Sequence, residues 1–104
     1  MTIQVGNVTT TPASVYTSVG NTAITFLSLC NYTAGNVAAN VYVVPSGGTA
    51  GNTNIIISNI NVAVEDTFQI YVGSEKLLLA NGDSVQVNAA ANNAITAVTS
   101  YTSI

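Results

Sequence analysis

The sequence predicts a single all-β domain, an antiparallel β-sandwich of the immunoglobulin-like or jelly-roll-like kind with seven to nine short strands. Short segments rich in Val, Ile, Thr and Tyr alternate apolar and polar residues, as half-buried strands do. Turn signals built from Gly, Pro and Asn separate these segments about every 8–12 residues. No segment has the period of an amphipathic helix. The 104 residues fit one domain that is long enough to bury a core.

The expected strands follow the apolar segments in order along the chain. They span Thr2–Val5, Ala13–Val19, Thr22–Cys30, Val37–Val44, Ile55–Ser58 with Ile60–Val64 as one strand or a pair, Thr67–Val72, Glu75–Leu79, Ser84–Ala89 and Ala94–Ile104. Pro45–Asn54 is the one long loop, because proline lacks a donor and the glycines permit positive φ. Asn81–Gly82 is the strongest hairpin signal, since a type I′ turn needs positive φ at both central residues.

The side-chain pattern assigns a core to these strands. In Thr22–Cys30 we place Ile24 and Phe26 on one face and Leu27 and Leu29 on the other, as in a central strand that is buried on both sides. The full set of expected core residues is Ile24, Phe26, Leu27, Leu29, Val41, Val43, Ile56, Phe68, Ile70, Leu78, Val85, Val87, Ile95 and Val98.

The first twelve residues have two interpretations. The stretch Thr9–Pro12 is an extended junction, because proline biases the residue before it away from helix. Residues 1–12 are therefore either an arm that binds a neighbouring protein by strand addition or the first strand of the sandwich, and residues 13–104 form the sandwich domain. Ile3, Val5 and Val8 are the apolar side chains with which an arm would bind.

The low charge of the chain excludes several classes of partner. Only 5% of the residues are charged, against about 25% in typical domains. The chain has one lysine, no arginine and no histidine. Contacts to phosphate groups need lysine and arginine, so we expect neither a nucleic acid nor a membrane as partner. The residues after Met1 lack a signal-peptide pattern, which favours synthesis in a cytoplasm.

The residues that catalysis and metal binding need are nearly absent. Without histidine, and with Glu65–Asp66 adjacent in a turn, we expect no catalytic residues and no enzyme activity. Cys30 lies in an apolar strand without a basic neighbour, as a small core residue does. Calcium could use Asp83 or Glu65–Asp66, but their spacing is not that of an EF-hand loop. We therefore expect no metal and no cofactor.

Two of the five tyrosines are candidate interface residues. Tyr42 lies on the polar face of its strand with Asn40, and Tyr32 lies in a loop. Protein interfaces are enriched in tyrosine and depleted in charge, as this surface is throughout. The alternative is that both rings pack at the edge of the core with their hydroxyl groups in water.

Several runs of the sequence together resemble small virion structural proteins of tailed bacteriophages, including those of cyanophages. The runs are Asn40–Ser46 followed by Gly47-Gly48, then Asp66–Phe68, Glu75–Val87 and Ile95–Tyr101. Within that class the chain is similar to capsid cement (decoration) proteins and to tail accessory proteins. The resemblance implies a β-sandwich, synthesis in the cytoplasm of a bacterial host, assembly into the virion and no catalytic residues.

We therefore expect a non-enzymatic capsid cement protein that bridges and stabilises neighbouring subunits of the major capsid protein. The alternative is a tail or fibre accessory module that binds a host-surface glycan or another tail protein. In both cases we expect a homo-oligomer, a trimer or a dimer, because an uncharged surface and strands with few charges at their edges favour close packing.

Overall fold

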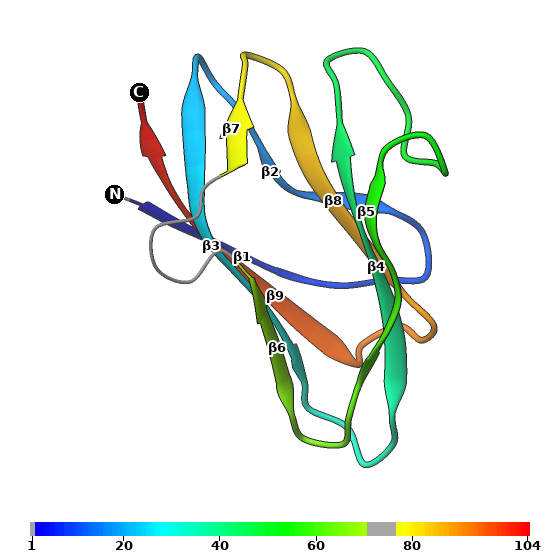
Figure 1. The fold of residues 1–104 in the computed structure, drawn as a ribbon. Helices are drawn as coiled ribbons and strands as arrows, with labels where there is room; N and C mark the ends of the chain where they lie inside the picture. The colour runs from blue at the N-terminus through cyan, green and yellow to red at the C-terminus, as the bar shows by residue number, and fades with distance from the viewer. Residues whose placement is uncertain (1, 71–76) are drawn as a thin grey trace.

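The chain folds into two antiparallel β-sheets packed face to face, which confirms the predicted β-sandwich (Figure 1). The computed structural model describes residues 2–70 and 77–104. The strands in this part of the chain are β1 (Thr2–Asn7), β2 (Ala13–Thr17), β3 (Thr22–Asn31), β4 (Val37–Val44), β5 (Ile55–Val62), β6 (Thr67–Ile70), β7 (Leu77–Leu79), β8 (Ser84–Ala89) and β9 (Ile95–Ser103). The two segments expected as one strand or a pair form the single strand β5.

The order of the strands defines the topology. Sheet A has the order β1-β9-β3-β6, with β7 also paired to β3, and sheet B has the order β2-β8-β4-β5. The pairs nest along the chain: β4 with β5, β3 with β6, β2 with β8, and β1 with β9. A long antiparallel ribbon folded over in this way is a jelly roll. Of the two kinds of sandwich that the sequence predicts, the topology is the jelly-roll-like one.

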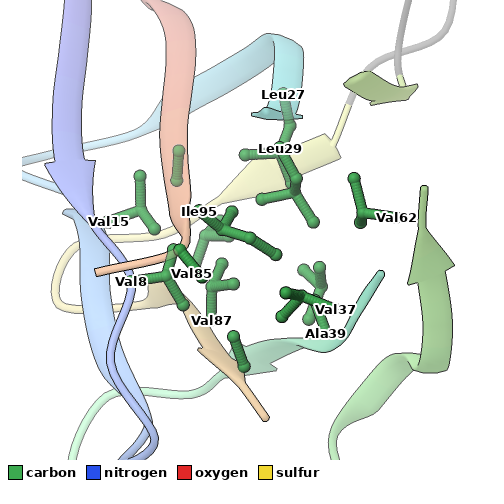
Figure 2. Packing of buried hydrophobic residues seen from close by; sticks show 14 of the residues in the cluster. Val8, Val15, Leu27, Leu29, Val37, Ala39, Val62, Val85, Val87 and Ile95 are labelled. Atoms are coloured by element: carbon green, nitrogen blue, oxygen red, sulfur yellow. The ribbon is translucent and has the colours of Figure 1, made fainter. Parts of the chain in front are cut away.

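The core lies between the two sheets, as Figure 2 shows. Ile24, Leu29 and Ile95 from sheet A meet Val41 and residues of β8 from sheet B. The four named side chains are fully buried. An aromatic pair also joins the sheets. The ring of Tyr16 on β2 stacks on that of Tyr101 on β9, with centroids 4.0 Å apart.

A β-bulge in β3 overturns the predicted faces of this strand. Ile24 lies opposite Tyr101 on β9 but Phe26 lies opposite Ser100, so Thr25 is an extra residue in β3. After a bulge the alternation of faces shifts by one residue. Ile24 therefore shares the core face with Leu27 and Leu29, and the half-buried Phe26 is on the outer face. The predicted grouping of Ile24 with Phe26 was wrong.

The other expected core residues divide by their place in the sheets. Those that are buried are Ile24, Leu27, Leu29, Val41, Val85, Val87 and Ile95, and those that are half-buried are Phe26, Val43, Phe68 and Val98. Ile56 and Leu78 are 44% and 65% exposed, so their assignment to the core was wrong. Ile56 falls at a register irregularity of β5, and Leu78 lies opposite Ala23 on the outer face of sheet A. The side chain of Ile70 lies outside the described part of the chain.

The Asn81–Gly82 turn does not close a hairpin. It joins β7, which pairs with β3 in sheet A, to β8, which pairs with β2 and β4 in sheet B. Asp83 N donates to Ala80 O at 3.1 Å, and of the two central residues only Gly82 has positive φ, at 88°. This is the pattern of a type II turn, so the predicted type I′ hairpin was wrong. The local sequence specifies a tight turn but not the sheet to which each flanking strand belongs.

Candidate protein-interaction surface

One face of sheet A points away from the core. Opposite residues of antiparallel strands project to the same side of a sheet, and β1, β9, β3 and β6 are in register across this face. One row of opposite residues runs Val5, Val98, Ser28 and Gln69. We call the whole set the outer face of sheet A; it consists of Ile3, Val5, Asn7, Ala23, Phe26, Ser28, Cys30, Thr67, Gln69, Leu78, Thr96, Val98, Ser100 and Thr102.

The side chains of this outer face are either apolar or polar without a charge. Ile3 and Val5 are 64% and 60% exposed. Phe26, Cys30 and Val98 are half-buried. Exposed apolar side chains that lie next to one another mark sites where other molecules pack. The face therefore suits contact with another protein surface.

Tyr32 extends this face beyond the end of β3. Its main-chain N donates to Ala94 O at 3.1 Å, and its hydroxyl donates to Asn7 Oδ1 at 3.1 Å. The other side-chain atom of that amide, Asn7 Nδ2, donates to Asn93 Oδ1 at 2.8 Å. The ring of Tyr32 is half exposed. Three of the five candidate interaction residues, Ile3, Val5 and Tyr32, thus lie on one surface.

Val8 and Tyr42 do not join that surface. Val8 is a buried member of the core, and its N–H donates to Ile95 O at 2.8 Å (Figure 2). Of the two interpretations of residues 1–12, the structure has Thr2–Asn7 as a strand of the sandwich, paired with β9. Tyr42 is buried on the outer side of sheet B, where its hydroxyl donates to Asn88 Oδ1 at 3.2 Å.

On the outer side of sheet B, side-chain amides bond to one another and to the main chain. Asn40 Nδ2 donates to Asn88 Oδ1 at 3.0 Å, and Asn40 Oδ1 accepts from the main-chain N of Asn59 at 2.7 Å. Asn88 Nδ2 in turn donates to Thr10 O at 3.2 Å. These bonds satisfy the side-chain amides of Asn40 and Asn88 within the chain.

The candidate metal ligand Asp83 has a structural role. Its Oδ1 accepts from Ser46 N at 2.9 Å and its Oδ2 from Ala80 N at 3.0 Å, so the carboxylate fastens the long β4–β5 loop to the turn before β8. In the described part of the chain, no three His, Cys, Asp or Glu residues cluster as metal ligands would. That part of the chain also contains no helix with the length and apolar character to span a membrane. Glu75 and Lys76 lie outside the described residues.

Cys30 was expected in the core, but it is half-buried on the outer face of sheet A. The fully buried Leu29 beside it takes the core position, because neighbours in a strand point to opposite faces. Phe26 and Val98 are likewise members of the outer face that the sequence interpretation placed in the core. The even mixture of small, polar and apolar residues on both faces of β9 leaves no periodic signal that would have found Val98.

The chain was compared with models of protein families, with curated proteins and with solved structures, and none of the three comparisons found a match. A proposal about function therefore depends on the structure itself, and its basis is the exposed apolar side chains on the outer face of sheet A.

Proposed function

We propose that this chain is a non-enzymatic structural protein of a virion, a capsid cement protein that lays the outer face of sheet A on neighbouring subunits of the major capsid protein. The exposure of Ile3 and Val5 on a face whose described side chains carry no charge is the observation that carries the proposal. The buried centres of protein interfaces are depleted in charge in the same way. A neutral contact also keeps its strength when the salt concentration changes, which suits a particle that leaves its host cell.

Two further features support the same assignment. The jelly-roll topology is an architecture that viral capsid domains use, although lectins use it as well. The runs from Asn40–Ser46 to Ile95–Tyr101 resemble small virion proteins of tailed bacteriophages. Both supports are analogies of fold and sequence, whereas the outer face is a property of this chain.

A second candidate function is a tail or fibre module that binds a host glycan. Tyr32 favours it, because its half-exposed ring lies beside the side-chain amides of Asn7 and Asn93. An aromatic ring with a polar edge, next to amide donors and acceptors, offers a sugar both a packing surface and hydrogen bonds.

The copy number of the chain in purified particles separates the two functions. A copy number comparable with that of the major capsid protein, measured by quantitative mass spectrometry, is the result expected for cement. A few copies per particle indicate a tail module, and absence of the chain from the particles overturns both.

A matched pair of variants tests which face binds. Ser100→Asp places a charge between Ile3 and Phe26 on the outer face of sheet A, and Ser14→Asp places the same charge on the exposed outer side of sheet B. In a cosedimentation assay with particles that lack the chain, Ser100→Asp is expected to weaken binding by about tenfold or more, because an unpaired charge is costly to bury. Ser14→Asp is expected to bind as the wild type does. Equal binding by both variants contradicts the assigned face.

A further inference from the structure

The edge of sheet A at β1 is open. Among the strands in residues 2–70 and 77–104, β1 is the last of the sheet and pairs only with β9. Val8 N donates to Ile95 O, and alternate residues of an antiparallel strand direct their main-chain groups to the same side. Gln4 and Gly6 therefore bond to β9, whereas Ile3, Val5 and Asn7 direct their N–H and C=O groups to the open side. All three of these residues are exposed.

The other edges of the sandwich are protected in ways that β1 is not. β2 contains a bulge at Val15 and follows Pro12. β5 has two register irregularities and a left-handed residue, Asn59, with φ of 52°. In the described residues, the far edge of sheet A is divided between two separate segments, β6 and β7, that pair with different parts of β3. Bulges, prolines, short strands and charges are the features that keep sheet edges from pairing with other chains.

β1 lacks these features. Its six residues, Thr2–Asn7, pair with β9 in an unbroken register, and they include no proline and no charged residue. Two of its side chains, Ile3 and Val5, are exposed apolar groups on the same face. A regular, uncharged, partly apolar edge strand is the kind that accepts another strand.

We propose that β1 pairs with β1 of a second copy of this chain, antiparallel across a two-fold axis, with Val5 opposite Val5 of the second copy. This register uses all three open residues and forms about six main-chain hydrogen bonds. An antiparallel strand pair is self-complementary under a two-fold axis, so a second copy of this chain fits the edge with its own β1. The strand is neutral, so two copies meet there without like-charge repulsion.

The pairing joins the two A sheets into one and brings Ile3 and Val5 of both copies together on a single outer face. It depends on the open edge and stands whether or not the chain is a virion protein. One strand per copy buries well under the roughly 800 Å² per partner of a standard interface. The dimer is therefore expected to dissociate on dilution.

Light scattering on the full chain over a dilution series tests the dimer, with a mass of twice 10.6 kDa expected at the concentrated end. Val5→Pro removes a donor that faces the open side and none that faces β9, so it is expected to abolish the dimer. Val5→Thr retains the donor and is expected to dimerise. Val5→Lys serves as a second blocking variant, and circular dichroism checks that each variant is folded. A wild type that is monomeric at every concentration or trimeric, or a folded Val5→Pro dimer, overturns the proposal.

Disulfide cross-linking tests the register. In a Cys30→Ser background, Val5→Cys places two thiols opposite each other, with Cα atoms about 5.5 Å apart, which a disulfide can bridge. Gln4 lies opposite Gly6 of the second copy, so Gln4→Cys pairs are about 8 Å apart and beyond that reach. Under mild oxidation, Val5→Cys is expected to form a covalent dimer and Gln4→Cys to stay uncross-linked. The reverse result overturns the Val5–Val5 pairing.

Discussion

The side-chain amide of Asn31 donates a hydrogen bond of 2.9 Å to the main-chain oxygen of Val62, and this bond ties β3 of sheet A to β5 of sheet B. The same Nδ2 atom donates to Gly35 O at 2.8 Å, and Oδ1 accepts from Thr33 N at 2.9 Å. Asn31 is fully buried, so water cannot replace any of these partners. One side chain therefore holds both the β3–β4 loop and the contact between the sheets at this end of the molecule.

Replacing Asn31 with alanine is expected to lower the free energy of unfolding by about 3 kcal/mol, because the buried Val62 O and the part-buried Gly35 O and Thr33 N lose their partner at once. Chemical denaturation monitored by circular dichroism measures the change. Asn52→Ala, at an exposed position in the β4–β5 loop, is the control and is expected to change stability by less than about 0.5 kcal/mol. Similar values for the two variants contradict the role assigned to Asn31.

Because the bulge at Thr25 places Ile24 and Phe26 on opposite faces, we expect truncation of the two side chains to lower the stability by different amounts. Ile24→Ala empties a fully buried position and is expected to cost about 2–5 kcal/mol. Phe26→Ala removes a larger side chain from the half-buried outer face and is expected to cost about 1 kcal/mol. The same denaturation experiment compares them. A Phe26→Ala variant as destabilised as Ile24→Ala would show that both residues face the core.

Any side chain at Gly82 is expected to destabilise the fold. A Cβ atom there lies 2.5 Å from Ser46 Oγ, and the φ of 88° disfavours other residues. Gly82→Ala is expected to cost about 1–3 kcal/mol in thermal or chemical unfolding. Gly51→Ala, with open space around its Cβ and an ordinary φ, is the control. Adding Ser46→Gly to Gly82→Ala removes the contact but not the backbone strain, so the double variant is expected to regain only part of the loss.

The hydrogen bonds of Asp83 lead us to expect that calcium does not stabilise the protein. Its two carboxylate oxygens already accept from Ser46 N and Ala80 N. The melting temperature is therefore expected to be the same with calcium and with a chelator. Asp83→Asn replaces one acceptor by a donor and is expected to cost about 1.5–3 kcal/mol, as for other hydrogen bonds to charged groups. A melting temperature that rises with calcium in the wild type but not in Asp83→Asn would establish a metal site.

The strands could be predicted from the sequence far better than their partners. Val37–Val44 and Ser84–Ala89 have the predicted bounds, because apolar residues alternate within them and turn residues flank them. Thr22–Asn31 is apolar on both faces, so no break in periodicity marks the bulge at Thr25. Nothing local assigns Leu77–Leu79 to sheet A, since that pairing depends on β3, more than fifty residues earlier.

The sequence identifies single residues of the candidate surface, but it does not show that they lie together on one face. The apolar residues Ile3 and Val5 stand out near the N-terminus, and Tyr32 stands out in its loop. That these three share a face with Phe26 and Val98 depends on the register of β1 and β3 against β9, which a single sequence does not encode locally. Val8 was selected by the same apolar criterion. It follows Asn7 of the outer face directly, and neighbouring residues point to opposite faces, so the side chain of Val8 lies in the core.

The nested order of the strand pairs also dictates how the chain folds. β4 and β5 are joined by one loop, whereas Ile3 pairs with Ser100 across almost the full length of the chain. The entropy lost on closing a loop increases with its length, so we expect the ribbon to zip from β4–β5 outward and β1 to dock last. A topology dominated by such distant contacts folds in milliseconds to seconds rather than microseconds. The open edge of β1 is then completed only after the other strands are paired, so that two copies meet as folded domains and not as half-folded chains.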